Sequence, residues 1–210
     1  MIFHDRKQAA TMLAEQLEDY KGRHPLILAI PRGAVPMAKI IADKLEGEFD
    51  VVLVRKLRAP DYPELAIGSI DESGWTYIAD HAASVGADNE YIETERQQQL
   101  ATIRQRRAQY TPIRPPIDPA ERIVIVIDDG LATGATMISA LHGLRSRKPA
   151  RLICAIPVSP PETLRKIQPL ADQVVCLAAP DNFRAVAQFY VDFPQVEDDQ
   201  VVAVLQNRQY

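Results

Sequence analysis

The 210-residue sequence contains little cysteine and little glycine. Its two cysteines, Cys154 and Cys176, are too few for a disulfide framework or a zinc cage, which favours a reducing compartment. Glycine occurs nine times against sixteen prolines, so each glycine more strongly indicates a special backbone requirement. Two of the nine, Gly130 and Gly134, fall in one short loop, which makes that loop the first place to look for a site.

The sequence also lacks a basic surplus and a long apolar run. Its 24 basic and 28 acidic residues give a net charge of −4, which argues against a general nucleic-acid binder. The longest apolar run, 152–158, is far shorter than the ~18 residues that span a bilayer. The first residues, 1–7, become polar at once and lack the pattern of a signal peptide. We therefore expect a cytoplasmic protein without membrane or nucleic-acid partners.

Hydrophobic periodicity predicts an α/β fold. Continuous apolar strands separated by amphipathic helices are typical of a parallel sheet that is covered on both faces. The predicted strands are 25–30, 51–54, 122–127, 152–158 and 173–177. We expect about five parallel strands in a single domain over 1–210, with a core at about 25–180. In open α/β sheets, ligands bind at the carboxyl ends of the strands.

The remaining segments are expected to surround this core. Asp5 and Gln8 predict a capped N-terminal helix. That helix, the tail 181–210, or both together would form a small hood. Residues 55–63 are basic and contain prolines, which predicts a loop, and 66–71 with 75–79 predict a hairpin. A polar helix is predicted over 89–110, where the late arginines are most simply a solvated face.

The polar residues best suited to bind a ligand follow the end of the predicted strand 122–127. Asp128 and Asp129 follow it, then comes a loop with Thr133 and Gly134, and then a helix begins near Thr136. Backbone N–H groups, hydroxyls and the helix dipole meet at one spot, which suits a phosphate monoester. Ionised carboxylates only accept hydrogen bonds, so they suit sugar hydroxyls. The pattern predicts a ribose 5-phosphate site, and the plain alternative is a polar strand-to-helix turn.

Two other nucleotide motifs are excluded by specific residues. No lysine follows Gly134, so the loop is not the Walker A loop of an NTPase. No GxGxxG pattern occurs, so the sequence lacks the dinucleotide fingerprint.

Four stretches of the sequence resemble one protein family. They are LAIPRGAVP at 28–36, VLVRK at 52–56, DDGLATGATM at 128–137 and FYVDF at 189–193. The third resembles the phosphoribosyl pyrophosphate (PRPP) signature of the type I phosphoribosyltransferases. Nearly end to end, the chain is similar to a bacterial branch of that family whose substrate is unassigned. This signature is specific for the fold and for ribose-phosphate binding, but it does not name the acceptor.

The resemblance implies roles for the matching positions. Asp128 and Asp129 would bind the ribose 2′- and 3′-hydroxyls, and Arg32 and Lys56 would bind pyrophosphate. The expected catalytic residues are therefore Asp128, Asp129, Arg32 and Lys56. The 5-phosphate would be held by Ala132, Thr133, Gly134, Ala135 and Thr136. The pyrophosphate site would comprise Pro31, Arg32, Gly33, Arg55 and Lys56, with a cis peptide between Pro31 and Arg32 and a lid at 57–68. The alternatives without a function are a plain turn at Arg32 and, for Arg55, Lys56 and the segment after them, a basic surface loop.

The reaction implied is that of a Mg²⁺-dependent glycosyltransferase (a pentosyltransferase), of the kind used in nucleotide salvage. A ring nitrogen of a base displaces pyrophosphate from C1 of PRPP, through a transition state resembling that of glycoside cleavage. Mg²⁺ would be held mainly by substrate oxygens and water, with Asp128 and Asp129 as candidate protein ligands. The expected partners are PRPP and a nucleobase-like acceptor, and a homodimer is left open.

The acceptor is where the sequence departs from known patterns. Ala132 occupies the position where 6-oxopurine enzymes place an aspartate, which argues against hypoxanthine, guanine or xanthine. Phe183, Phe189 and Tyr190 are candidates for stacking on a base, although packing of the hood explains them as well. The alternative function is a non-catalytic module that senses PRPP, and the presence of Arg32 and Lys56 favours the enzyme.

Overall fold

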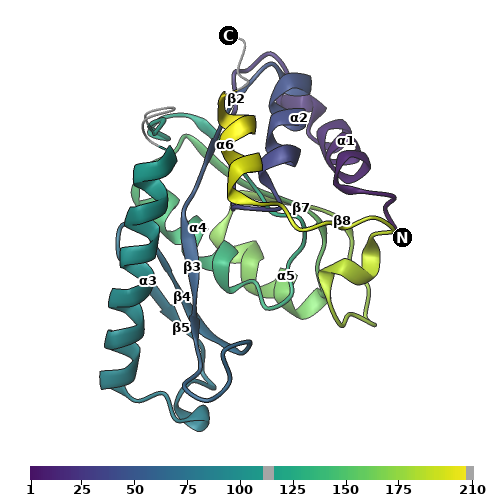
Figure 1. Cartoon of the computed structure of the whole chain (residues 1–210). Helices are drawn as coiled ribbons and strands as arrows, with labels where there is room; N and C mark the ends of the chain where they lie inside the picture. The colour runs from purple at the N-terminus through teal and green to yellow at the C-terminus, as the bar shows by residue number, and fades with distance from the viewer. Residues whose placement is uncertain (111–115, 207–210) are drawn as a thin grey trace.

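The computed structural model describes residues 1–110 and 116–206, and a parallel sheet forms its centre (Figure 1). The five strands run in the order β2-β1-β6-β7-β8, and every neighbouring pair is parallel. They are β1 (Leu26–Ala29), β2 (Glu48–Val51), β6 (Ile123–Ile127), β7 (Arg151–Val158) and β8 (Gln173–Ala178). The predicted α/β fold with five parallel strands is therefore confirmed.

Helices cover both faces of this sheet because successive strand residues point to opposite sides. Ile27 and Ile125 pack in one apolar cluster with α1 (Arg6–Gln16) and α2 (Val35–Leu45). Leu28 and Val126 pack in a second cluster with α4 (Ala135–Ser146) and α5 (Pro161–Ile167). Both clusters are buried, which explains why the strands are apolar throughout rather than alternating.

A second, antiparallel sheet lies beside the long helix α3 (Asn89–Tyr110), as Figure 1 shows at lower left. Its strands are β3 (Val54–Arg58), β4 (Ala66–Asp71) and β5 (Thr76–Ile78). The predicted hairpin and the predicted helix 89–110 are both present. The strand expected at 51–54 and the loop expected from residue 55 are wrong, because β2 ends at Val51 and β3 begins at Val54 in the other sheet.

The residue pattern of β3 explains that error. Buried Val54 lies on the same face as exposed Lys56 and Arg58, and buried Leu57 lies on the other face beside half-buried Arg55, so this short edge strand lacks a regular alternation of apolar and polar residues. The basic residues and the nearby prolines suggested an irregular loop. The connection between β3 and β4 is in fact confined to residues 59–65.

The N-terminal segment contacts a segment near the C-terminal end of the chain. Phe3 forms a parallel bridge with Tyr190, and the rings lie 5.5 Å apart. Asp5 caps α1 by accepting a hydrogen bond from Gln8 N at 2.7 Å, as predicted. The last helix, α6 (Asp198–Gln206), packs against α2. The two terminal segments therefore contact each other and the helices of the sheet, and the assignment of a separate small hood stays a prediction.

Four short 3-10 turns complete the described elements: η1 (Glu18–Tyr20), η2 (Ala83–Val85), η3 (Gln168–Leu170) and η4 (Val186–Phe189). Among the described residues, none of the helices combines the length and the apolar character needed to cross a membrane.

Replacing Gly143 of α4 with alanine tests the contact between α4 and the second sheet. A Cβ at Gly143 would lie 2.0 Å from Asp71 Oδ2, and Asp71 Oδ1 accepts hydrogen bonds from Ser73 N and Trp75 N at 2.9 and 3.0 Å. Helix propensity alone would make Gly143→Ala stabilising by about 1 kcal/mol. We expect a loss of about 1–3 kcal/mol instead, because the methyl group must displace a buried, hydrogen-bonded side chain. Denaturant unfolding measures the change, and a variant more stable than the wild type would contradict the contact.

Candidate active site

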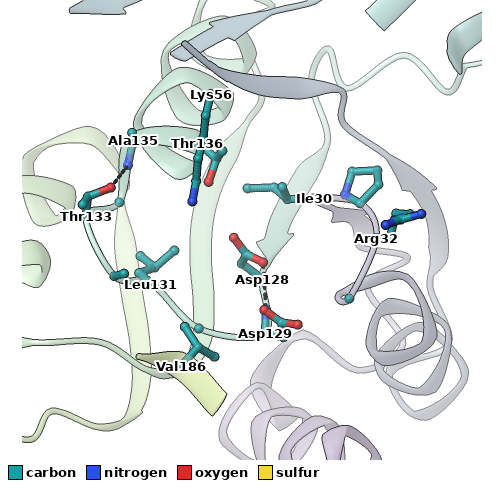
Figure 2. Close-up of a pocket in the computed structure, with 15 residues that line it drawn as sticks. Ile30, Arg32, Lys56, Asp128, Asp129, Leu131, Thr133, Ala135, Thr136 and Val186 are labelled. Atoms are coloured by element: carbon teal, nitrogen blue, oxygen red, sulfur yellow. Dashed lines mark hydrogen bonds between the residues drawn. The ribbon is translucent and has the colours of Figure 1, made fainter. Parts of the chain in front are cut away.

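The site lies where two neighbouring parallel strands end. β1 and β6 pair along their whole length, so the segments that follow them emerge at the same edge of the sheet. Between these segments is a cavity of about 270 Å³ (Figure 2). It is lined by residues 30–33 after β1, residues 128–136 after β6, Lys56 and Val186. The structure therefore brings together most of the residues that the sequence singled out.

The loop between β6 and α4 presents free amides to this cavity. In the described part of the chain, the N–H groups of Ala132, Thr133 and Gly134 donate no hydrogen bond. The loop is held from outside instead, because Leu131 N donates to Val158 O at 2.9 Å and Thr163 Oγ1 donates to Ala132 O at 2.6 Å. Unsatisfied amides at a helix N-terminus form an anion-binding site.

Gly134 is required at the start of α4 for two reasons. Its φ of +76° lies in the left-handed region, where other residues are strained. A Cβ there would lie 2.8 Å from Thr163 Cγ2. The residue therefore fixes the loop at a sharp turn, and the short side chains of Thr133 and Thr136 remain beside the cavity.

Asp128 and Asp129 form the cavity wall across from the loop 131–134, and the ionised forms of their carboxyl groups are disfavoured there. Asp129 N donates to Asp128 Oδ1 at 2.9 Å. Burial raises the pKa of Asp128 well above its ordinary value and the charge of Asp129 raises it further, whereas Lys56 opposes the rise. Figure 2 shows the Lys56 side chain extending into the cavity toward Asp128. Lys56 thus supplies positive charge to this wall, as its place in the predicted site requires.

Asp129 has a partner that the sequence analysis missed. Arg6 of α1 donates to Asp129 Oδ2 from Nε at 2.9 Å and from Nη2 at 2.8 Å. Burial raises the pKa of Asp129, and the charge and hydrogen bonds of Arg6 restrain that rise. The Arg6 guanidinium also lies 3.8 Å above the Phe193 ring and donates to Pro194 O at 2.6 Å. One arginine therefore joins the first helix, the tail and the acidic wall.

The segment after β1 packs tightly against this ion pair. The peptide bond between Pro31 and Arg32 is cis, which confirms the expectation from the family resemblance. A Cβ at Gly33 would lie 2.0 Å from Asp129 Oδ2 and 3.1 Å from Arg6 Nη2, so only glycine fits. Gly33 therefore allows its backbone to lie close to Asp129 and Arg6.

Arg32 points away from the acids in Figure 2 and pairs with the first turn of α6. Its Nη1 lies 2.9 Å from Glu197 Oε2 and 3.8 Å from Asp198 Oδ2. Arg55 also lies apart from the acids and donates Nε to Gln99 Oε1 at 2.9 Å. Of the expected pyrophosphate residues, Pro31, Arg32, Gly33 and Lys56 line the main cavity, and Arg55 lines a neighbouring one.

The three candidate base-stacking residues lie in the segment that follows β8 and are absent from the cavity lining. The rings of Phe183 and Phe189 stack at 5.2 Å, and those of Tyr190 and Phe193 stack at 4.6 Å. Phe189 and Tyr190 are buried, and Tyr190 Oη donates to Asp129 O at 2.7 Å. Their role in base binding stays a prediction, while Val186 supplies an apolar side chain to the cavity.

Oxygen ligands suit Mg²⁺, and the cavity offers the carboxylates of Asp128 and Asp129. The described residues contain no group of three or more His, Cys, Asp or Glu side chains able to hold a metal ion. Mg²⁺ demands six ligands, so two carboxylates fit an ion whose other ligands are substrate oxygens and water.

The pair of Arg6 and Asp129 predicts a pH-dependent change in stability. Replacing Arg6 with glutamine leaves a largely buried carboxylate without its partner, which we expect to cost about 2–3 kcal/mol at neutral pH. The pKa of Asp129, already raised by burial, rises further in this variant. The deficit should therefore shrink as the pH falls through that higher pKa, because the protonated carboxyl no longer needs a cation.

Unfolding measured across pH for wild type and Arg6→Gln checks this prediction. Lys7→Gln removes an equal charge from an exposed neighbour on the same helix, and it should leave stability nearly unchanged at every pH. A deficit in Arg6→Gln that stays constant down to acidic pH would contradict an electrostatic role for Arg6.

Comparison with known proteins places this site in a family. The family model described as the phosphoribosyl transferase domain matches residues 2–194. A protein of Mycobacterium tuberculosis H37Rv, which carries the provisional name of a phosphoribosyl transferase, is 37% identical over 205 residues. That match covers 97% of this chain and 46% of the mycobacterial protein, so the chain spans about half the length of the curated relatives it matches.

Solved structures agree with the assignment. The crystal structure of TT1426 from Thermus thermophilus is 40% identical, with a TM-score of 0.82 and 98% of each chain covered. The purine phosphoribosyltransferase of Pyrococcus horikoshii is 17% identical, with a TM-score of 0.50 and coverage of 91% of this chain and 93% of that one. The second likeness shows the fold alone. Since the family model matches most of the chain and the mycobacterial relative is 37% identical over 97% of it, the chain belongs to the phosphoribosyl transferase domain family, as its sequence motifs predicted.

Proposed function

We propose that the protein binds PRPP and transfers its 5-phosphoribosyl group to a nitrogenous base, with release of pyrophosphate. The observation that carries this proposal is the opposition of two kinds of group across one cavity. Free amides of Ala132, Thr133 and Gly134 lie at the start of α4, and two half-buried carboxylates lie at the end of β6. A sugar with an anion at one end and neighbouring hydroxyls at the other complements both walls.

Each wall has a separate part in holding the sugar. The amides of the loop and the hydroxyls of Thr133 and Thr136 bind the 5-phosphate, aided by the dipole of α4. Asp128 and Asp129 accept hydrogen bonds from the 2′- and 3′-hydroxyls, and their ionised forms are the stronger acceptors. Lys56 and Arg6 favour the ionised forms of these acids, because Lys56 opposes the rise in the pKa of Asp128 and Arg6 opposes that of Asp129. The ribose ring is then fixed between two rigid elements.

The chemical step breaks the bond between C1 and the pyrophosphate oxygen and forms a bond from C1 to a ring nitrogen. The electron pair of the broken bond leaves with pyrophosphate, and the acceptor releases its proton to solvent. Lys56 and Arg32 stabilise the charge that develops on the leaving group. Arg32 is available because Glu197 and Asp198 are more than 40% exposed, so water can replace it there. No protein nucleophile is required.

Mg²⁺, when bound with the substrate, neutralises part of the pyrophosphate charge. Asp128 and Asp129 are the residues that would contact it, alone or through water. Lys56 reaches the same cavity from β3, so the chain itself contributes a second source of positive charge there.

The acceptor is proposed as a class rather than as one compound. Leu131, Ala132 and Val186 give the cavity wall small or apolar side chains beside the phosphate loop. Ala132 provides no carboxylate that could face a purine ring nitrogen. These residues fit a flat base recognised by shape and by backbone groups.

Replacing Asp128 or Asp129 with asparagine tests the proposal. Asparagine keeps the size but offers a weaker, neutral acceptor, so each variant should bind ribose 5-phosphate and PRPP about 10- to 100-fold more weakly. Calorimetry measures binding, and pyrophosphate release from PRPP with a panel of bases measures turnover. Asp80→Asn, at an exposed position outside both cavities, is the matched control and should behave as the wild type.

Two results would change the proposal. Failure of the wild type to bind either sugar phosphate would contradict it outright. Binding of PRPP without pyrophosphate release on any base would favour the alternative function, a module that senses PRPP.

A further inference from the structure

The stretch FYVDF at 189–193 carries part of the family resemblance, but the function proposed above gives it no role. It lies at the end of η4, in the segment that follows β8. Two of its aromatic side chains contact Asp129 by separate routes, Tyr190 through a hydrogen bond and Phe193 through Arg6. Neither aromatic residue lines the main cavity. Any effect of this stretch on a bound sugar must therefore act through Asp129.

Asp129 is fixed at both of its peptide groups and at one carboxylate oxygen. Its N–H donates to Asp128 Oδ1 at 2.9 Å, and its carbonyl oxygen accepts a hydrogen bond from Tyr190 Oη at 2.7 Å. Its Oδ2 accepts two hydrogen bonds from Arg6, at 2.9 and 2.8 Å. In the described part of the chain, no N–H, alcohol or phenol group donates to the other carboxylate oxygen, Oδ1. Oδ1 is therefore the oxygen that remains for a sugar hydroxyl.

Tyr190 is suited to hold this residue and poorly placed to stack on a base. It is only 7% exposed, and its ring lies 5.5 Å from the Phe3 ring and 4.6 Å from the Phe193 ring. Burial raises the pKa of the Tyr190 hydroxyl and the charge of Asp129 raises it further, so the group stays protonated. The ring thus has little free surface for a base, while the hydroxyl remains a hydrogen-bond donor.

Phe193 restrains Arg6, which binds the carboxylate of Asp129. The Arg6 guanidinium lies 3.8 Å above the Phe193 ring, and its Nη1 donates to Pro194 O at 2.6 Å. A guanidinium that stacks on an aromatic ring keeps its N–H groups free to donate in its own plane. The stacking therefore sets the plane in which Nε and Nη2 of Arg6 reach Asp129 Oδ2.

The same segment also contacts the residue that follows Asp129. A Cβ at Gly130 would lie 2.6 Å from Val186 Cγ1, so the main chain packs directly against the start of η4. Tyr190 follows the end of η4, and its hydroxyl bonds the carbonyl group that joins Asp129 to Gly130. Residues 186–193 therefore support the main chain immediately after the first carboxylate pair.

We propose that Tyr190 and Phe193 are positioning residues for Asp129. Tyr190 fixes its main chain and Phe193 fixes Arg6, so that Oδ1 is held ready for a sugar hydroxyl. A group that is already ordered loses less conformational freedom when the ligand binds. The inference rests on the proposed function, in which Asp129 accepts a hydrogen bond from ribose, and extends it to two residues that do not touch the sugar. It also replaces base stacking as the role of Tyr190.

Replacing Tyr190 with phenylalanine deletes one hydroxyl and keeps the ring. Tyr190→Phe should bind ribose 5-phosphate about 3- to 10-fold more weakly in calorimetry without any base, because Asp129 loses one restraint. Inorganic phosphate should bind within about twofold of the wild type, because the loop amides are unchanged. The amide signals of Thr133 and Gly134 in nuclear magnetic resonance follow this second titration. A residue that only stabilised the fold would not weaken one ligand and spare the other.

Tyr91→Phe is the matched control for this deletion. Tyr91 Oη also donates to a main-chain carbonyl, Arg58 O at 2.9 Å, and Tyr91 lines neither cavity. This variant should bind both ligands as the wild type does.

Two substitutions at Phe193 test the route through Arg6. Phe193→Leu removes the ring beneath the guanidinium and should weaken ribose 5-phosphate binding about as much as Tyr190→Phe does. Phe193→Tyr keeps an aromatic ring there and should restore binding to within about twofold of the wild type. Circular dichroism confirms that each variant is folded.

The outcomes separate this inference from the proposed function. Equal ribose 5-phosphate affinity in wild type and Tyr190→Phe would overturn the inference alone and leave base stacking as the role of Tyr190. Parallel losses for ribose 5-phosphate and inorganic phosphate would also overturn it, because they would indicate general damage to the site. If the wild type binds no ribose 5-phosphate, the proposed function fails and the inference fails with it.

Discussion

Two consecutive, half-buried carboxylates at the end of β6 are the constraint on which the rest of the site depends. Burial disfavours the ionised forms of both, and the charge of Asp129 further disfavours that of Asp128, so the surrounding residues must compensate. Arg6 does so for Asp129, and Lys56 does so for Asp128. Gly33 leaves room for the ion pair to form. Acids with perturbed pKa values in a cavity are candidates for a functional site, which is the basis of the binding role proposed for them.

That compensation explains why the N-terminal segment and a segment near the C-terminal end of the chain converge on Asp129. Arg6 lies 123 positions before Asp129, and Tyr190 lies 61 positions after it, yet both bond to that residue. The bridge between Phe3 and Tyr190 holds the two segments together. Arg32 is tied to Glu197 at the start of α6 in the same way. The two terminal segments therefore contribute to the electrostatics of the site.

The sequence predicted the features that depend on neighbouring residues in the chain. It did not predict those that depend on contacts between residues far apart in the sequence. The apolar run before Asp128 and the Gly and Thr residues after it determine a strand, a loop and a helix within one segment, so this part was predictable. The cis bond before Arg32 followed only from family resemblance. Arg55 and Lys56 were assigned to a loop, because a short edge strand without a regular alternation of apolar and polar residues lacks a distinctive local pattern. Arg6 resembles an ordinary helix-surface residue until tertiary packing shows what it faces.

The central claim is that the free amides after β6 bind a phosphate group, while Asp128 and Asp129 accept hydrogen bonds from the hydroxyls of the attached sugar. Nuclear magnetic resonance of the ¹⁵N-labelled protein titrated with ribose 5-phosphate tests it most directly. The account predicts that the amide signals of Thr133 and Gly134 shift most, and that ribose without its phosphate moves them little. Saturation by ribose 5-phosphate that leaves these two amides unchanged while signals elsewhere shift would contradict the account.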